Sequence, residues 1–497
     1  MKKLISTTFV FLLLTLLSRA QGLNFNDEAY RKVPLKFAKQ TSIGEGLPAR
    51  VDLSMYVPTV KDQGRFGTCV GFATAYYART ILEAIRRKTT NQDSIDALRF
   101  SPSYLYNFIK DSTDLTCMDG TEIELALEFM KKNGVVGFAE QGYPVCENNA
   151  ALKPQPSSKL SDYIKLFGLI DREENIVAAT KKALSERTPV IIGIQTTASL
   201  DELKNVGYWT KLWWKIKRFF GIYAADDIAV WKPSKSKSIR SGHALCVVGY
   251  DTAKYEGAFQ VVNSRGKDYG DEGFFWIRFS DYAKYTKYGY QAILNSQDDG
   301  TSPVLSAEIA FVDATFTTGT EMRFRDTLAL RPTIMTFSLK DSLPTGSQFK
   351  CQLTVNQQCY LYVIGAGGKP LTTGQLIPLA DSLSALIGIN SKVLLPSEDS
   401  LFHLEGEAGR EFLLFLFSKN PIENLEQYTD RINDGRGDFS TRIAAVFGTN
   451  LVPSHQLRAT HQPKKIGFEL RGKYSGQIVP ILVSFEHIAE KPNRRAL

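Results

Sequence analysis

The sequence predicts an α+β domain followed by an all-β sandwich domain. Segments with helical periodicity occupy the first part of the chain, and short apolar strand-like runs replace them from Val190 onward. After a polar, turn-forming linker at 297–303, short alternating strands recur with little helical signal. The chain has 497 residues, 43% of them hydrophobic and 23% charged, a length that suits about two or three domains.

The first twenty residues are expected to form an export signal. Lys2 and Lys3 precede an apolar run at 4–17, and residues 18–20 resemble a small-residue cleavage site. The run is shorter than the ~20 residues of a membrane span, which favours cleavage over a signal anchor. We therefore expect a protein that is secreted, periplasmic or at the cell surface, with a short N-terminal segment at 21–45.

Three helices are predicted before the strands begin. The first starts at Cys69, follows one apolar face and ends near Lys88. The second spans Glu122 to Lys132 and stops at Asn133-Gly134, and the third spans 174–186 before Pro189.

Short apolar and alternating runs predict the strands. In the first domain they lie at 190–194, 244–250, 258–262 and 274–279, and the last run ends near Leu294. Beyond the linker, a strand at 349–355 is expected to form a hairpin with 360–364 through a turn at Asn356-Gln357, and further strands lie at 411–417 and 481–485. This pattern favours a β-sandwich over 304–490.

The charge pattern argues against a nucleic-acid partner. The formal net charge is +8, and basic residues alternate with acidic ones instead of forming a long basic arm.

Six cysteines in an exported chain allow both disulfide bridges and a reactive thiol. They are Cys69, Cys117, Cys146, Cys246, Cys351 and Cys359. If one of them is a nucleophile, two bridges and two free thiols is the simplest arrangement, and the pairing of Cys351 with Cys359 stays open. Cys246 lies in an apolar run, where we expect a buried and inert thiol.

Cys69 has the setting of a nucleophile, because it stands where a loop enters a helix. The helix N-terminus favours the thiolate. Gln63, six residues earlier, can donate an amide hydrogen to the oxyanion that forms when the thiolate attacks a carbonyl. The alternative is a cysteine that only packs in the core.

A nucleophilic thiol needs a base, and the base needs an orienting group. His243 opens the predicted strand at 244–250, whereas the other four histidines lie in the C-terminal half. Asn263 follows the strand at 258–262, and its side-chain carbonyl can accept the imidazole hydrogen. A core histidine and a turn-forming asparagine are the alternatives.

Taken together, these residues resemble the papain-like cysteine peptidases over about residues 46–296, in a bacterial secreted form. The resemblance rests on Gln-Gly-x-x-Gly-x-Cys at 63–69, Gly-His-Ala and Val-Gly-Tyr within 242–250, and Asn-Ser with the following glycines within 263–275. It implies a papain-like fold with a helical lobe and an antiparallel β-barrel-like lobe. It also implies catalytic roles for Gln63, Cys69, His243 and Asn263.

The same resemblance implies a disulfide between Cys117 and Cys146. We also expect residues 118–121 to line one side of the cleft, with substrate bound by Asp119, Gly120 and Gly242. No metal or organic cofactor is expected, since the histidines and cysteines lack ligand spacing.

The chain also departs from the family pattern. Val70 and Arg265 stand where the family usually has tryptophans, and Phe66 replaces a cysteine of a usual bridge. The spacing from Cys69 to His243 exceeds the typical ~130 to 150 residues, so an insertion is expected between them.

The insertion is assigned to residues 208–220, where aromatic residues alternate with Lys and Arg. Three interpretations stay open: a membrane-surface helix, a lid over the cleft, or a helix that packs on its own domain with extended lysines.

The C-terminal half resembles, more loosely, a bacterial domain of unknown function found after peptidase and kinase domains. The likeness rests on Tyr360-Leu361-Tyr362-Val363-Ile364, on Ile377-Pro378 and on residues 407–411. We expect this domain to bind or position a partner whose identity the sequence does not give. Arg436-Gly437-Asp438 spells an integrin-binding tripeptide, but its neighbours favour a turn.

The sequence therefore predicts a secreted cysteine endopeptidase that acts on protein or peptide substrates through a Cys69 thioester. The alternatives are a transpeptidase or cell-wall amidase with the same thiolate chemistry, and a catalytically weak binding or adhesion protein.

Overall fold

The structure is a computed structural model, and it describes residues 22–36, 46–147, 158–203, 213, 216, 229–233, 241–294, 304–314, 320–325, 329–330, 334–380, 382–389, 391–397, 400–472 and 474–489. These residues form two compact units, the described parts of Met1–Val33 with Pro48–Leu294, and of Pro34–Leu47 with Asn295–Leu497. The predicted export signal, the linker and residues 208–220 other than Trp213 and Ile216 lie outside the described residues.

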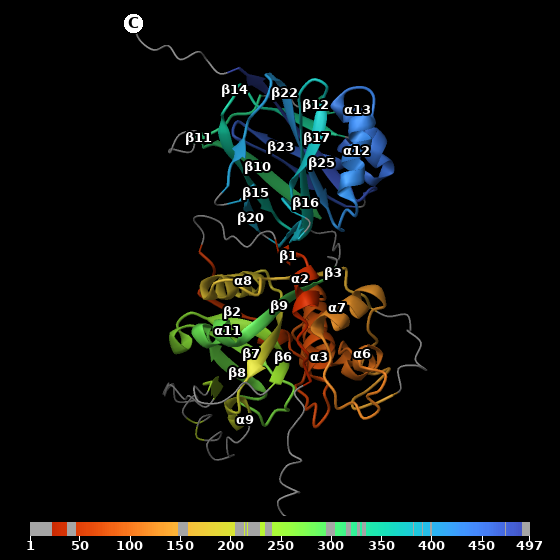
Figure 1. Ribbon diagram of the computed structural model, residues 1–497, viewed down its shortest axis with the longest axis vertical. Helices are drawn as coiled ribbons and strands as arrows, with labels where there is room; N and C mark the ends of the chain where they lie inside the picture. The colour runs from red at the N-terminus through yellow and green to blue at the C-terminus, as the bar shows by residue number, and fades with distance from the viewer. Residues whose placement is uncertain are drawn as a thin grey trace, which may run out of the picture. The chain divides into compact units, whose positions relative to one another are not determined.

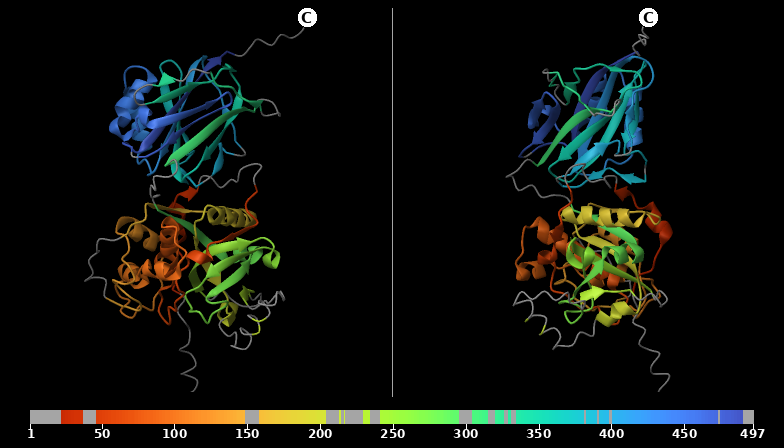
Figure 2. Two further views of the ribbon diagram at one scale, coloured as in Figure 1. Left: turned by 180° about the vertical axis from the view of Figure 1, so that it is seen from behind. Right: turned by 90° about the vertical axis from the view of Figure 1, so that its left-hand side faces the viewer.

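In the first unit, α3, α6 and α7 lie on one side and β6 to β8 on the other, as Figure 1 and the rear view in Figure 2 both show, while α8 and α11 pack against the strands. The helices are α2 Asp27–Lys32, α3 Cys69–Gly71, α4 Thr80–Arg86, α5 Gln92–Ala97, α6 Pro102–Ile109, α7 Ile123–Lys132, α8 Glu173–Ser185, α9 Ser199–Glu202 and α11 Phe279–Tyr285. The predicted helices at 122–132 and 174–186 are confirmed as α7 and α8.

The helix predicted from Cys69 to Lys88 is present, but its middle is wider than an α-helix. A π-helical stretch, Phe72–Arg79, separates α3 from α4. The Thr80 hydroxyl donates to the Ala75 carbonyl five residues back, and the Thr74 hydroxyl donates to the Val70 carbonyl. Side-chain bonds of this kind compete with the regular backbone ladder, so apolar spacing predicts the helix but not its wider turns.

The sheet of the first unit is mainly antiparallel, as predicted. Its strands are β2 Arg50–Asp52, β3 Asp162–Lys165, β4 Val190–Thr196, β5 Val230–Trp231, β6 Ser241–Asp251, β7 Ala258–Val262, β8 Phe274–Arg278 and β9 Thr286–Ile293. They run in the order β3-β9-β4-β6-β7-β8-β5, with β2 beside β6. Among these described strands, β5 alone pairs in parallel, with β8. Strand β6 lies against α3, so the start of the first helix meets the central strands.

The second unit is a sandwich of two sheets. One sheet has the order β20-β15-β10-β24-β23, with β11 and β21 beside it, and the other has the order β12-β13-β25-β22-β16-β17, with β14 and β19 beside it. The strands are β1 Leu35–Lys36, β10 Leu305–Asp313, β11 Thr320–Glu321, β12 Ala329–Leu330, β13 Met335–Ser338, β14 Leu343–Pro344, β15 Gln348–Val355, β16 Cys359–Gly367, β17 Thr372–Ile377, β18 Leu383–Ser384, β19 Leu386–Ile387, β20 Lys392–Leu395, β21 Phe402–His403, β22 Gly409–Ser418, β23 Leu457–Gln462, β24 Lys465–Leu470 and β25 Ile478–Ile488. Apolar residues from both sheets form one core.

The predicted hairpin between 349–355 and 360–364 is wrong. Strand β15 pairs with β10, β20 and β21, whereas β16 pairs with β17, β19 and β22 in the other sheet. The chain therefore crosses from one sheet to the other at the predicted turn. Cys351 and Cys359 are both buried free thiols, so they form no bridge in this structure.

Two helices interrupt the second unit, although the sequence showed little helical signal there. They are α12 Leu425–Asp434 and α13 Phe439–Phe447, and Figure 1 shows them side by side next to β17. Arg436-Gly437-Asp438 forms the connection between them. The Asp438 carboxylate caps α13 by accepting from the Thr441 amide at 2.8 Å. The predicted turn at this tripeptide is therefore present.

No described helix of the chain is long and apolar enough to cross a membrane.

Candidate active site

Cys69 is the first residue of α3 and is fully buried. Its Sγ accepts a hydrogen bond from the Ala244 amide of β6 at 3.5 Å. The loop before it is held by Tyr143, whose hydroxyl donates to the Gln63 carbonyl at 2.6 Å and lies 2.8 Å from the Thr68 hydroxyl. The thiol is thus fixed at a helix N-terminus beside the strand that carries His243.

His243 and Asn263 form the predicted pair. The imidazole Nε2 lies 2.9 Å from the Asn263 Oδ1, and both side chains are buried. Because the asparagine oxygen can only accept, Nε2 carries the hydrogen. The other ring nitrogen, Nδ1, is buried and has no hydrogen-bond partner among the described residues. Nδ1 is therefore an unprotonated acceptor, available to take a proton from a neighbouring thiol.

Gln63 is held in one orientation by Ser264. The Ser264 hydroxyl donates to the Gln63 Oε1 at 2.5 Å, and the Gln63 Nε2 donates to the Phe66 carbonyl at 2.9 Å. A backbone bond from the Gln63 amide to the Ser264 carbonyl ties the two loops together. This arrangement fixes which end of the amide donates and leaves one Nε2 hydrogen for an oxyanion.

Phe66, which replaces a cysteine of the family pattern, belongs to an aromatic cluster. Its ring meets Tyr143 edge-on at 6.3 Å between centroids, and Phe72 meets the same tyrosine at 4.8 Å. Aromatic packing thus occupies the position of the absent bridge.

The predicted disulfide between Cys117 and Cys146 is present. It anchors the segment 117–121, which forms one wall beside Cys69. The Gly67 amide donates to the Cys117 carbonyl at 2.9 Å. A Cβ at Gly67 would lie 2.0 Å from the Asp119 carbonyl oxygen, so the wall approaches this closely only because residue 67 is glycine.

The N-terminal segment 22–26 lies between the two walls to which substrate binding was assigned. Leu23 bridges to Thr121 in parallel and to Gly242 in antiparallel orientation. The Asn24 amide donates to the Thr121 carbonyl at 2.9 Å, and the Thr121 amide donates to the Gly22 carbonyl at 3.0 Å. The Asn24 side chain donates to the Gly120 carbonyl at 2.7 Å. We call residues 22–26 the cleft strand.

The fit of the cleft strand is close. Leu23 is 4% exposed, and a Cβ at Gly193 of β4 would lie 3.0 Å from the Leu23 side chain. A Cβ at Gly22 would lie 1.9 Å from the Gly67 carbonyl oxygen, so only glycine at position 22 permits this approach. Beyond the strand, α2 is anchored by Asn26, which donates to Glu122 at 3.0 Å, and by the ion pair of Asp27 with Lys287 at 2.8 Å.

With the cleft strand in place, the thiol and the imidazole are both neutral. Burial raises the pKa of the Cys69 thiol to about 11, although the amides of Ala244 and Gly22 and the charge of Arg265 act in the opposite direction. Burial lowers the pKa of His243 to about 3, Arg265 lowers it further, and the Asn263 hydrogen bond opposes both effects. The dry site thus disfavours the charged thiolate–imidazolium pair.

The two residues that replace the usual tryptophans of the family pattern have different surroundings. Val70 is buried in the core under Cys69. Arg265 is also buried, yet it carries a charge, and its guanidinium lies 2.6 Å from the Asp201 carboxylate of α9.

Three parts of the site escaped the sequence prediction. The alternation Leu23-Asn24-Phe25-Asn26 is a strand signal that could have marked the cleft strand. Residues 118–121 were expected to line one side of the cleft, but the pairing of Thr121 with the cleft strand and the contact of Asp201 left no local signal, because the partners lie far away in the sequence.

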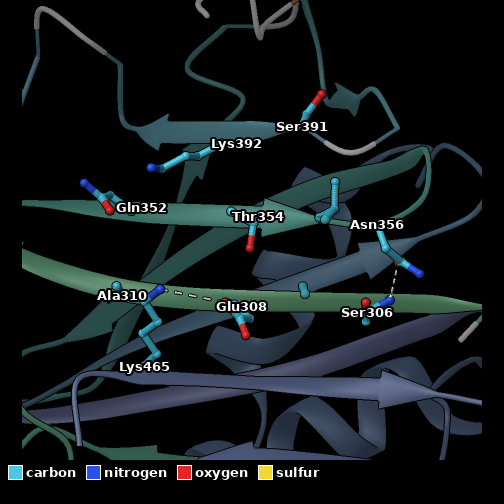
Figure 3. A pocket seen from close by; sticks show the side chains of 11 residues that line it. Ser306, Glu308, Ala310, Gln352, Thr354, Asn356, Ser391, Lys392 and Lys465 are labelled. Carbon is cyan, nitrogen blue, oxygen red and sulfur yellow. Dashed lines mark hydrogen bonds and ion pairs between the residues drawn. The ribbon is translucent and has the colours of Figure 1, made fainter. Parts of the chain in front are cut away.

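A separate hollow occurs in the second unit, lined by polar side chains of β10, β15, β20 and β24 (Figure 3). Asn356 accepts from the Ser306 amide at 2.6 Å, and Lys465 lies 4.0 Å from Glu308. The described residues that line it include no cysteine or histidine.

Comparisons with known proteins match the first unit. A family model described as papain family cysteine protease matches residues 47–291. The chain is 25% identical to the probable cysteine protease RDL2 of Arabidopsis thaliana over 233 residues, which are 46% of this chain and 55% of that protein. It is 24% identical to the oryzain gamma chain of Oryza sativa subsp. japonica over 223 residues, 44% of this chain and 51% of that one. The chain thus spans about half the length of these curated relatives.

Solved structures are similar as well. A crystal structure of xylellain, a cysteine protease from Xylella fastidiosa, has a TM-score of 0.41 at 19% identity and covers 56% of this chain and 97% of the other. A structure of the bromelain protease from Ananas comosus, in complex with the E64 inhibitor, has a TM-score of 0.34 at 17% identity and covers 50% and 99%.

Proposed function

Since residues 47–291 form a cysteine protease domain of the papain family, we propose that this protein is an exported cysteine endopeptidase that hydrolyses peptide bonds through a thioester on Cys69. The observation that carries the proposal is the buried His243–Asn263 hydrogen bond of 2.9 Å. It leaves the His243 Nδ1 without a partner among the described residues, on the same strand, β6, whose Ala244 amide donates to Sγ of Cys69.

The proposed reaction uses these residues in two stages. His243 takes the thiol proton, and Sγ of Cys69 attacks the scissile carbonyl carbon while Gln63 and the Cys69 amide donate to the oxyanion. The tetrahedral intermediate then collapses: the C–N bond breaks, and His243 gives its proton to the departing amine. In the second stage His243 takes a proton from water, and the resulting hydroxide attacks the thioester, which releases the acid and restores the thiol.

A substrate must first displace the cleft strand. Residues 22–24 use the backbone groups of Thr121, the Gly120 carbonyl and the space above Gly242, and a peptide that binds between these walls needs the same groups. We therefore propose that the described arrangement is a closed state, and that departure or removal of the cleft strand precedes turnover.

Export and the role of the second unit are parts of the same proposal. The disulfide between Cys117 and Cys146 suits an oxidising compartment, which agrees with the export signal predicted at 1–20. The sandwich is proposed to bind or position a partner of the enzyme. We also propose that residues 208–220 contact a membrane surface, where Trp213, 63% exposed, can insert. Binding of a carrier-linked 208–220 peptide to anionic vesicles tests this contact.

Labelling with an irreversible epoxide thiol inhibitor tests the peptidase proposal. We expect one adduct, located on Cys69 by mass spectrometry, together with cleavage of a peptide library. Cys69→Ala is expected to lose both signals, whereas Cys246→Ala, which removes another buried free thiol, is expected to keep them. A folded wild-type protein without Cys69-dependent labelling would favour the binding or adhesion alternative.

The transferase alternative is separated by the products. With an added amine acceptor, a hydrolase gives mainly free acid, whereas a transpeptidase gives the new amide. A cell-wall amidase would instead cleave peptidoglycan fragments in preference to the peptide library.

A further inference from the structure

Arg265 is an unusual neighbour for the thiol and the imidazole, because it brings a buried positive charge to the loop that carries Asn263. Its side chain is 7% exposed. The backbone of Arg265 bridges to Asp62, and the Gly266 amide donates to the Lys61 carbonyl at 3.2 Å. The loop that positions Asn263 is therefore fastened to the loop that carries Gln63, with Arg265 at the junction.

The guanidinium is held in place from the other side by α9. Its NH1 lies 2.6 Å from the Asp201 Oδ1, and the Asp201 side chain is 36% exposed. Tyr269, whose ring lies 6.0 Å from the guanidinium carbon, donates its hydroxyl to the Leu200 carbonyl at 2.7 Å. The arginine end of the ion pair is thus buried on the loop that carries Asn263, and the aspartate end reaches solvent.

Several titratable and charged groups lie around the site. They are Tyr77 of the π-helical stretch, Tyr106 of α6, Tyr143, Tyr269, the carboxylates of Asp62 and Asp119, and the Arg265–Asp201 ion pair. Burial raises the pKa of each of these tyrosines above its ordinary value, so they stay neutral around pH 7. Asp62 and Asp119 are exposed to solvent, which screens their charge, so the guanidinium of Arg265 is the buried charge among these groups.

We propose that Arg265, anchored by Asp201, is a positioning residue that sets the pH range in which the Cys69–His243 pair is active. This inference rests on the proposed function and adds a control of its protonation. A fixed cation beside the pair stabilises the thiolate and destabilises the imidazolium. Arg265 lowers the pKa of Cys69 and the pKa of His243. Asp201 offsets part of this effect.

The two partners of the ion pair therefore act in opposite directions. Neutralising Arg265 removes the cation and shifts the whole pH profile upward, whereas neutralising Asp201 leaves the cation uncompensated and shifts the profile downward. A merely structural ion pair would not do this, because loss of either partner would then have the same effect.

The test compares Arg265→Gln, Arg265→Lys and Asp201→Asn in the full-length protein. The pH dependence of kcat/KM and of Cys69 alkylation by iodoacetamide are measured for each variant. We expect both profiles to move up by roughly one pH unit in Arg265→Gln, to move down by a smaller amount in Asp201→Asn, and to stay closest to the wild type in Arg265→Lys. Glu128→Gln removes a half-exposed carboxylate that pairs with Lys132 and accepts from the Tyr163 hydroxyl, and it is the control for a single charge change.

Shifts in the same direction for Arg265→Gln and Asp201→Asn, or shifts no larger than that of Glu128→Gln, would overturn the proposal. If Arg265→Gln does not fold, the partly exposed Asp201 position and Arg265→Lys decide the matter. If the wild type shows no Cys69-dependent hydrolysis, the proposed function fails, but the alkylation profiles still report whether Arg265 controls the thiol.

Discussion

Replacing Leu23 with alanine is expected to open the cleft above Cys69. The Leu23 side chain is buried near Gly193, Ile123 and Phe25, and it is the fully buried apolar side chain of the cleft strand. The backbone bonds of Gly22 and Asn24 to Thr121 can be replaced by water when the strand leaves, so their net contribution is small. The apolar contact therefore dominates the stability of the closed state.

The size of the effect follows from this burial. Complete burial of a leucine side chain contributes about 1.5 to 3 kcal/mol, and truncation to alanine removes most of it, about 2 kcal/mol. Since 1.4 kcal/mol corresponds to a factor of ten, the population with an open cleft rises about 30-fold.

The assay is the rate of Cys69 alkylation by iodoacetamide at low reagent concentration, measured together with peptide hydrolysis. Both rates are expected to rise about 30-fold in Leu23→Ala while the open state remains the minor population. Gly22→Val, which places a side chain against the Gly67 carbonyl, is expected to act in the same direction. Leu184→Ala removes the same atoms from the core at α8 and controls for general destabilisation. Equal rates in Leu23→Ala and the wild type would refute the closed-state interpretation.

Three further outcomes are expected. Asn263→Ala removes the hydrogen bond that orients His243 and should lower kcat/KM by about tenfold or more, the equivalent of ~1.5 kcal/mol, with little change in KM; an unchanged kcat/KM would exclude this role. Glu83, which pairs with three arginines, has a pKa lowered to about 2 in the folded state. The ionised Glu83 therefore stabilises the fold fully above its unfolded-state pKa of ~4.5, and this stabilisation is lost as the pH falls toward 2. Glu83→Gln should lower the free energy of unfolding by about 3 kcal/mol at pH 7 and make it depend less on pH in acid. Urea titrations at several pH values check both. The double variant Cys117→Ser, Cys146→Ser removes the disulfide that closes a loop of sequence separation 29. It should lower the free energy of unfolding by about 3 to 4 kcal/mol and raise KM. An unchanged Tm in calorimetry would argue against this stabilising role of the disulfide.

The sequence predicted those parts of the site whose signals are local. Cys69 lies at a helix start, and His243 and Asn263 lie beside apolar strands, so each setting is visible within a few neighbouring residues. The structure brings His243 and Asn263 into contact because β6 and β7 are adjacent antiparallel strands, an arrangement that two consecutive strand signals already favour.

Features that depend on distant pairing were not predictable in this way. The cleft strand contacts Thr121 and Gly242, about 100 and 220 residues later in the chain, and the ion pair of Arg265 with Asp201 joins a loop to α9, two segments that share no sequence pattern. The error at 349–364 has the same origin. Alternation correctly indicated two strands, but it does not state which sheet each strand joins, and the sandwich core places β15 and β16 in different sheets.

The central claim is that Cys69 forms a thioester with the acyl part of a peptide and that water resolves it. The most direct measurement is rapid quenching of the protein during turnover of a peptide substrate, followed by mass spectrometry of the Cys69-containing fragment. We predict an acyl adduct on Cys69 that appears and decays at the rate of product formation, and that is absent in Cys69→Ser and in His243→Ala. Peptide cleavage at the full rate by Cys69→Ser, or an adduct on another residue, would contradict the account.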